Sequence, residues 1–90
     1  MVLTVGLDEQ LSVNEQLVKV FPNPFSSELK FSASELVTEI SLYNSLGMLI
    51  TTINSNSQEL SMDTKDLAPG IYFIHYTTEK GIGIKKLIKQ

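Results

Sequence analysis

The chain has 90 residues, a formal net charge of −3 and no cysteine. This length supports one small domain with a single hydrophobic core. The missing cysteines exclude disulfides, thiolate metal sites and cysteine catalysis, and the acidic balance argues against a general nucleic-acid binder, which would carry a basic face.

The first segment, residues 1–16, is mostly polar and shows no convincing periodicity. We interpret it as a linker or lead-in, with a short strand near residues 3–7. The apolar residues 1–7 have no basic residues before them and are followed at once by Asp8 and Glu9, so they do not predict a signal peptide. No apolar run approaches the ~20 residues of a membrane helix, so direct membrane insertion is not expected.

A rigid turn is predicted at Val20-Phe21-Pro22-Asn23-Pro24-Phe25. Each proline fixes its own φ and biases the residue before it toward an extended conformation. Because proline cannot donate to a β-ladder, this stretch is not expected inside a central strand. The two phenylalanines suggest that the turn is pinned to the core.

From Leu17 onward the hydrophobic pattern is that of β-strands, with turn signals at intervals of roughly 8–12 residues. Polar turns are predicted at residues 44–47, where Gly47 is free to take a positive φ, and at residues 54–57. The expected strands are residues 18–21, 29–33, 38–43, 48–53, 60–62, 70–77 and 82–88. They predict an all-β domain, a seven-stranded immunoglobulin-like antiparallel β-sandwich with Greek-key topology.

A tyrosine corner is predicted at Leu67-Ala68-Pro69-Gly70-Ile71-Tyr72. In that device the ring packs inward and its hydroxyl bonds back to the main chain of the preceding loop. Gly70 tolerates whatever φ the corner needs. With Tyr72 inward, alternation places Ile74 and Tyr76 on the core side as well. The motif favours the immunoglobulin-like topology.

Residues with catalytic or metal-binding chemistry are scarce. The only histidine, His75, has no other histidine or cysteine near it in the sequence, and we interpret it as a partly exposed strand residue. Asp63 and Asp66 lie in a loop, but a calcium site takes about 6–8 oxygen ligands, and loop capping explains these carboxylates better. The sequence shows no set of nucleophile, general base and orienting group that would indicate a catalytic site. The sequence therefore predicts no enzyme, cofactor or metal site.

Three lysines, Lys85, Lys86 and Lys89, gather at the C-terminus of this acidic chain. They either guard an edge strand against aggregation or form a recognition element. The hydrophobic register is uneven here, because the isoleucines share one face while Leu87 falls on the other. A β-bulge near Lys85 and Lys86 is expected for that reason.

Taken in order, four motifs resemble the type A C-terminal sorting domain of the type IX secretion system, found in certain Gram-negative bacteria. They are Val20-Phe21-Pro22-Asn23-Pro24-Phe25, Ile40-Ser41-Leu42-Tyr43-Asn44-Ser45-Leu46-Gly47, Leu67-Ala68-Pro69-Gly70-Ile71-Tyr72-Phe73 and Lys85-Lys86-Leu87-Ile88-Lys89. The resemblance covers about residues 17–90. The positions expected to carry the motifs and recognition are Pro22, Asn23, Pro24, Gly47, Gly70, Tyr72, Lys85, Lys86 and Lys89. We expect the Pro-Asn-Pro segment to pin the start of the sandwich, while recognition lies mainly nearer the C-terminus.

The resemblance implies that residues 17–90 are a C-terminal secretion signal and that residues 1–16 lead in from an absent passenger protein. The domain would fold in the periplasm and be recognised by the outer-membrane type IX translocon, which exports the cargo to the cell surface or beyond. A sortase-like peptidase would then cut upstream of residue 17. The alternative is a fibronectin-like carbohydrate-binding or adhesion module, although 8% aromatic residues and no tryptophan supply little for stacking on sugars.

Overall fold

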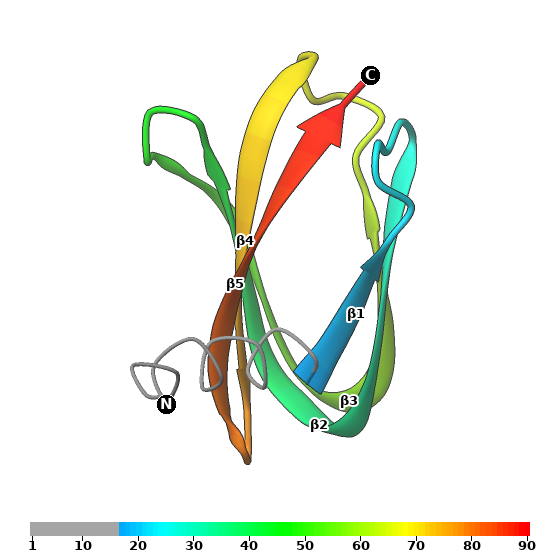
Figure 1. The fold of residues 1–90 in the computed structure, drawn as a ribbon, viewed down its shortest axis with the longest axis vertical. Helices are drawn as coiled ribbons and strands as arrows, with labels where there is room; N and C mark the ends of the chain where they lie inside the picture. The colour runs from blue at the N-terminus through cyan, green and yellow to red at the C-terminus, as the bar shows by residue number, and fades with distance from the viewer. Residues whose placement is uncertain (1–16) are drawn as a thin grey trace, which may run out of the picture.

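The structure, a computed structural model, describes residues 17–90, which form β-strands joined by turns and loops (Figure 1). The strands in this range are β1 (Val18–Phe21), β2 (Glu28–Asn44), β3 (Leu49–Asp63), β4 (Gly70–Thr78) and β5 (Gly81–Lys89). Their alternation of apolar and polar side chains suits a sheet with one buried face. The prediction of an all-β domain is confirmed. The short strand expected near residues 3–7 lies outside the described residues.

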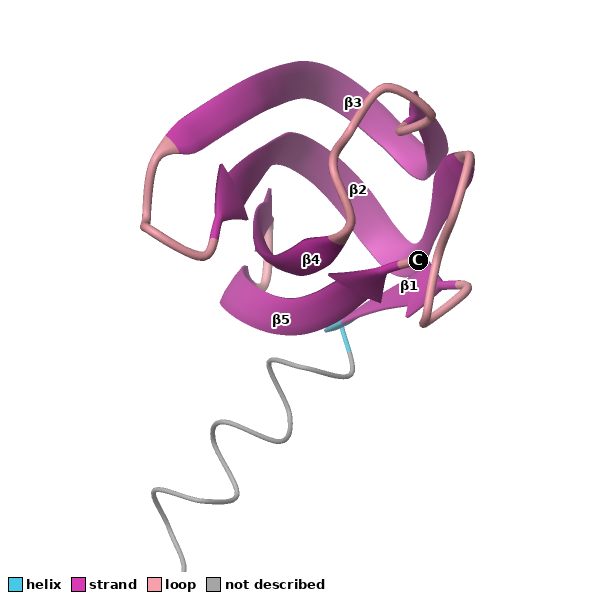
Figure 2. Cartoon of the chain, turned by 90° about the horizontal axis from the view of Figure 1, so that it is seen from above, coloured by secondary structure: helices cyan, strands magenta, loops and turns pink. Residues whose placement is uncertain are grey.

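All of these strands join one antiparallel sheet in the order β1-β2-β4-β5, with β3 paired to β2 beside this path. β2 is the central strand. Its first half pairs with β1 and with the end of β3, whereas its second half pairs with the start of β3 and with β4. The sheet therefore curls, and from above its strands wrap around a shared interior (Figure 2).

Two expected chain breaks are bends within long strands, so the described chain has five strands where the sequence predicts seven. The second and third expected segments both lie in β2, and the fourth and fifth both lie in β3. The β2–β3 ladder shifts register between Ser32 and Val37. At this bend Gln58 Nε2 donates a 2.8 Å hydrogen bond to the carbonyl of Ser34. A side chain thus bridges the irregular stretch. Residues 54–57 stay extended instead of forming the predicted turn, because they belong to β3, where Asn54 and Ser57 pair with β2.

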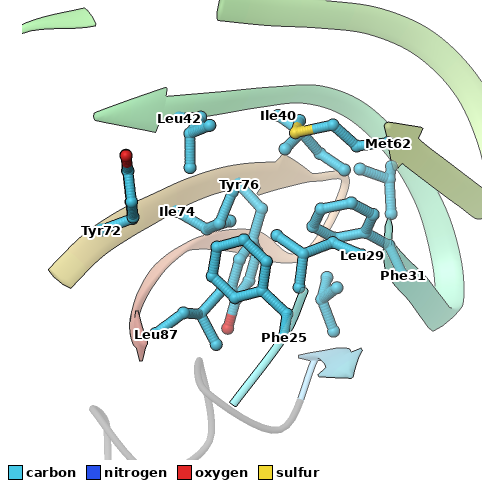
Figure 3. Packing of buried hydrophobic residues seen from close by; sticks show 12 residues of the cluster. Phe25, Leu29, Phe31, Ile40, Leu42, Met62, Tyr72, Ile74, Tyr76 and Leu87 are labelled. Carbon is cyan, nitrogen blue, oxygen red and sulfur yellow. The ribbon is translucent and has the colours of Figure 1, made fainter. Parts of the chain in front are cut away.

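The core lies inside the curl and draws on every strand (Figure 3). Burial of each large side chain contributes roughly 1.5–3 kcal/mol, so the hydrophobic cluster is what holds the curled sheet closed. The buried hydrophobic residues are Val18, Phe25, Leu29, Phe31, Val37, Ile40, Leu42, Met62, Tyr72, Ile74, Tyr76 and Leu87.

Strand β4 confirms the predicted tyrosine corner. The Tyr72 hydroxyl donates a 2.6 Å hydrogen bond to the carbonyl of Ala68. Tyr72, Ile74 and Tyr76 are all buried, as alternation predicts. The Tyr72 ring also meets Phe25 edge to face, with ring centroids 6.1 Å apart. The corner therefore joins β4 to the connection between β1 and β2.

Strand β5 runs in continuous register with β4 over its whole length. The bulge predicted near Lys85 and Lys86 is therefore wrong. Unbroken alternation turns Leu87 into the core and leaves the three isoleucines of β5 exposed on the outer face. The inner face needs no large side chain near the start of β5, because the ring of Tyr76 lies against Gly83.

Candidate functional site: the terminal strand and its anchor

The Pro-Asn-Pro segment follows β1 directly and leads toward β2. Both of its prolines are preceded by cis peptide bonds. As predicted, the segment lies outside the main strands. Phe25 is fully buried, whereas Phe21 is 44% exposed. Only one of the two phenylalanine rings therefore pins this segment to the core.

This segment holds the end of β5. Asn23 Oδ1 accepts a 3.1 Å hydrogen bond from the N–H of Ile88. The N–H of Phe25 donates to the Ile88 carbonyl, and the N–H of Gln90 donates to the Phe25 carbonyl, each at 2.9 Å. Neither proline has an N–H to donate, so Phe25 supplies the main-chain donor of this contact, and Asn23 adds a side-chain acceptor. The first and last motifs of the described chain thus lie in contact.

The loop between β3 and β4 bonds to Ser26 and Ser27, the two residues that follow Phe25. Thr64 is 1% exposed. Its N–H donates a 2.9 Å hydrogen bond to the Ser27 carbonyl, and its hydroxyl donates a 3.0 Å bond to the Ser26 carbonyl. Sequence reasoning missed Thr64, because one threonine in a polar loop belongs to no periodic pattern.

Two adjacent carbonyls of the same loop receive bonds from β4 and β5. Lys89 Nζ donates a 3.0 Å hydrogen bond to Leu67, next to the Ala68 carbonyl that accepts from Tyr72. Gly70 starts β4 with φ +148°, a conformation that favours glycine, and pairs with Lys89. We call this cluster, formed by residues 22–27, 64–72 and 87–90, the terminal anchor. It contains the predicted positions Pro22, Asn23, Pro24, Gly70, Tyr72 and Lys89.

The lysines of β5 occupy three different environments. Lys89 is only 8% exposed, so it belongs to the terminal anchor and is no free surface charge. Lys85 is half-buried on the same side of β5 as Leu87, and Lys86 is exposed on the outer side. Within residues 17–90, Lys65 and Asp63 form the sole ion pair. β5 ends the strand order β1-β2-β4-β5, so Lys85 and Lys86 sit where edge-guarding lysines are expected.

Gly47 lies apart from the terminal anchor, in the turn between β2 and β3 (Figure 1, green). It has φ +84°, and its N–H donates a 2.9 Å hydrogen bond to the Asn44 carbonyl. The Asn44 side chain accepts two more bonds, from the N–H groups of Leu46 and Met48. Gly47 therefore shapes this turn as predicted, and the fold does not bring it to the other motif positions.

His75 and Asp63, which were considered above as catalytic or metal-binding candidates, make contacts that serve the fold. His75 is exposed, with its ring centroid 4.5 Å from that of Tyr43. Asp63 accepts a 3.0 Å hydrogen bond from the N–H of Lys65, which is the predicted loop capping. Across residues 17–90, no three histidine, cysteine or acidic side chains are grouped to hold a metal ion. In the same range no helix has the length and apolarity needed to cross a membrane.

Gly83 is a second position that sequence reasoning missed. A Cβ atom added there would lie 2.7 Å from Tyr76 Cε1, closer than carbon atoms pack. Only glycine therefore leaves room for the buried ring on the neighbouring strand. The sequence does contain a signal for this contact, because a glycine inside a strand pattern often marks the close approach of another group.

Comparison with known proteins gives one family. The model described as "Secretion system C-terminal sorting domain" matches residues 19–90. No curated protein matches the chain. The matched range contains β2 to β5 and the whole terminal anchor.

Proposed function

Since the chain belongs to the family of secretion system C-terminal sorting domains, we propose that residues 17–90 are the sorting domain of a longer protein and that residues 1–16 lead in from its passenger. Members of this family are C-terminal sorting signals for type IX secretion, and theirs is not an enzyme family. Such a signal acts with the type IX secretion machinery to export a passenger protein to the cell surface or the extracellular space. The observation that carries this function is the family match, which spans all four sequence motifs.

The outer-membrane translocon reads the domain mainly at β5. The exposed position of Lys86 on this strand supports that assignment. Tyr72 and Lys89 serve the fold, because both are buried and bonded to the loop between β3 and β4. Pro22, Asn23 and Pro24 position β5 through the terminal anchor, and Gly47 shapes a remote turn.

The domain passes through the periplasm in the folded state, binds no cofactor and has no catalytic activity of its own. A sortase-like peptidase cuts upstream of residue 17 and separates the domain from its passenger. The fibronectin-like binding module has less support, because the family match already accounts for the motifs.

The curled sheet is a variant of an immunoglobulin-like sandwich with Greek-key connections. The support for this reading is that β2 and β3 each bend and pair with different strands on either side of the bend. Each long strand would then contribute to both layers. Cross-strand contacts measured by NMR test this reading. Contacts that divide β2 and β3 at their bends between two facing layers are expected, and direct pairing of β1 with β5 along their whole length would contradict it.

Fusion of residues 17–90 to a periplasmic reporter tests the function in a host that has a type IX system. We expect the reporter outside the cell, while an unrelated β-domain of similar size leaves it in the periplasm. A folded fusion that stays in the periplasm would contradict the function. Deletion of residues 85–90 is a poor test, because it removes the buried Leu87 and so changes the fold.

Substitution of Lys86 tests recognition at β5 without that complication. Lys86→Glu should reduce export, while the matched exposed variant Lys30→Glu on β2 should not. Equal export of the two variants would place recognition elsewhere on the domain.

A further inference from the structure

The outer side of the last hairpin carries a group of exposed isoleucines. On β5, Ile82, Ile84 and Ile88 are 64%, 52% and 46% exposed, and on β4, Ile71 is 40% exposed. Ile71 and Ile88 are cross-strand partners. We call these four residues the isoleucine face. Exposed apolar groups on the surface of a soluble domain mark sites of interaction when they gather in a patch. Here Lys86 lies between Ile84 and Ile88 on the same side of β5, so the patch combines apolar groups with a positive charge.

The same strand has one main-chain edge along which no strand of residues 17–90 pairs with it, which we call the free edge. β5 pairs with β4 along one side, and along the other side the described residues bond only to its end, through Asn23 and Phe25. Both the N–H and the carbonyl of Ile88 take part in those bonds, so they point away from β4. Main-chain groups alternate along a strand with a period of two. The N–H and carbonyl groups of Ile82, Ile84 and Lys86 therefore point to the free edge.

The free edge and the isoleucine face thus belong to the same residues. A strand that paired with Ile82, Ile84 and Lys86 would also lay alternate side chains beside the isoleucine face. Recognition of extended segments by strand addition combines main-chain hydrogen bonds for affinity with side-chain contacts for specificity. β5 offers both, next to the terminal anchor that fixes its end.

Charge indicates which strand would bind there. Lys85 and Lys86 lie along the free edge, and neither is in an ion pair with another described residue. Pairing of β5 with β5 of a second copy would bring four lysines together, and like charges across a strand pair are destabilising. Lysines at an edge oppose such self-pairing. An acidic partner strand satisfies the same charges.

We propose that the type IX machinery recognises this domain by adding an extended segment to the free edge of β5. The segment carries aliphatic side chains against the isoleucine face and acidic side chains near Lys85 and Lys86. This inference rests on the proposed function, and it specifies both the mode of recognition and the chemistry of the partner.

Proline substitution tests the edge separately from the side chains. Ile84→Pro removes an N–H that has no partner among the described residues, and proline is tolerated on edge strands. Ile84→Val is the comparison variant, because it keeps the N–H and an aliphatic, β-branched side chain. In the reporter fusion, we expect Ile84→Pro to lower the exported fraction about tenfold or more, since a blocked main-chain bond interrupts strand addition. Ile84→Val should lower export clearly less than Ile84→Pro does.

The outcomes separate the two levels of the proposal. If the wild-type fusion is not exported, the proposed function fails and this inference fails with it. If the wild-type and the folded Ile84→Pro fusions are exported equally, only the inference is wrong. Thermal unfolding of the purified variants establishes folding. Should Ile84→Pro unfold, the double variant Lys85→Glu/Lys86→Glu takes its place, and undiminished export of that variant would also overturn the inference.

Peptide binding to the whole chain tests the partner chemistry directly. The probes are two synthetic peptides, one alternating valine with glutamate and the other alternating valine with lysine. We expect the acidic peptide to bind about tenfold tighter than the basic one, to shift the amide resonances of Ile82, Ile84 and Lys86, and to lose its advantage with Lys85→Glu/Lys86→Glu. Equal binding of both peptides, or a concentration-dependent dimer of the free chain formed through β5, would contradict an acidic partner strand.

Discussion

Asn23 accepts a 3.1 Å hydrogen bond from the main-chain N–H of Ile88, which lies 65 positions further along the chain. With the two bonds of Phe25, this contact fixes the last residues of β5 on the side where no other strand of residues 17–90 pairs with them. The motif that opens the domain is therefore structurally part of the strand that ends it. A change in either motif is expected to act on the other.

Substitution of Asn23 tests this link. Asn23→Ala removes the acceptor for the Ile88 N–H, and because the site is exposed we expect a cost of about 0.5–1 kcal/mol in the free energy of unfolding. Faster hydrogen exchange at the Ile88 amide should accompany it. Asn23→Asp is the matched control, since its side chain has the same length and keeps an acceptor oxygen. Its free energy of unfolding should stay near that of the wild type. Unchanged exchange in Asn23→Ala would show that the bond does not hold β5.

The tyrosine corner predicts a larger effect. Tyr72→Phe leaves the ring in the core and removes only the hydroxyl that bonds to Ala68. Loss of a partner for a part-buried carbonyl costs about 1–3 kcal/mol. Tyr43→Phe is the control, because it makes the same chemical change at a half-buried residue outside the core, and it should shift stability by less than about 0.5 kcal/mol. Urea denaturation of both variants measures the difference, and equal midpoints would contradict the assigned role of Tyr72.

Local patterns predict the fold of this chain well where one face is buried. Alternation along β4 correctly places Tyr72, Ile74 and Tyr76 in the core, because the period of a strand is fixed by its backbone. The same reasoning fails at the bends of β2 and β3. Whether a polar stretch turns or stays extended depends on its pairing with another strand, here of Asn54 and Ser57 with β2, and a local pattern contains no information about that pairing.

The candidate site is harder to predict for the same reason. The motifs of the terminal anchor can be recognised separately in the sequence, but the contact between Asn23 and Ile88 joins residues far apart in the chain. The lysines also look equivalent in sequence, although Lys89 is buried and Lys86 is exposed. The bulge near Lys85 and Lys86 was wrongly predicted because the isoleucines and Leu87 fall on opposite faces of β5. The strand needs no bulge, because the isoleucines stay exposed and the inner position at Gly83 is filled by the ring of Tyr76 from the neighbouring strand.

Gly83 and Tyr76 give a prediction about packing. Gly83→Ala puts a Cβ atom against the Tyr76 ring, and overpacking of this kind typically costs about 1–3 kcal/mol. In a Tyr76→Leu background the same substitution should cost clearly less, because the ring that it meets is gone. A double-mutant cycle by chemical denaturation measures this coupling. Equal costs of Gly83→Ala in both backgrounds would show that the ring and the glycine do not constrain each other.

The different environments of Lys89 and Lys86 lead to opposite expectations for stability and export. Lys89→Met removes the bond to the Leu67 carbonyl while filling similar space, and hydrogen bonds from charged groups contribute roughly 1.5–3 kcal/mol. It should therefore lower the unfolding midpoint, and export should fall only to the extent that the fold is lost. Lys86→Met, on the exposed side of β5, should leave stability within about 0.5 kcal/mol and still reduce export of the reporter. Unfolding midpoint and exported fraction are measured on the same two fusions. A lysine needed only for folding changes the midpoint, whereas a lysine needed for recognition changes the exported fraction alone. If Lys86→Met destabilises the domain as much as Lys89→Met, the two lysines do not divide structure and recognition in this way.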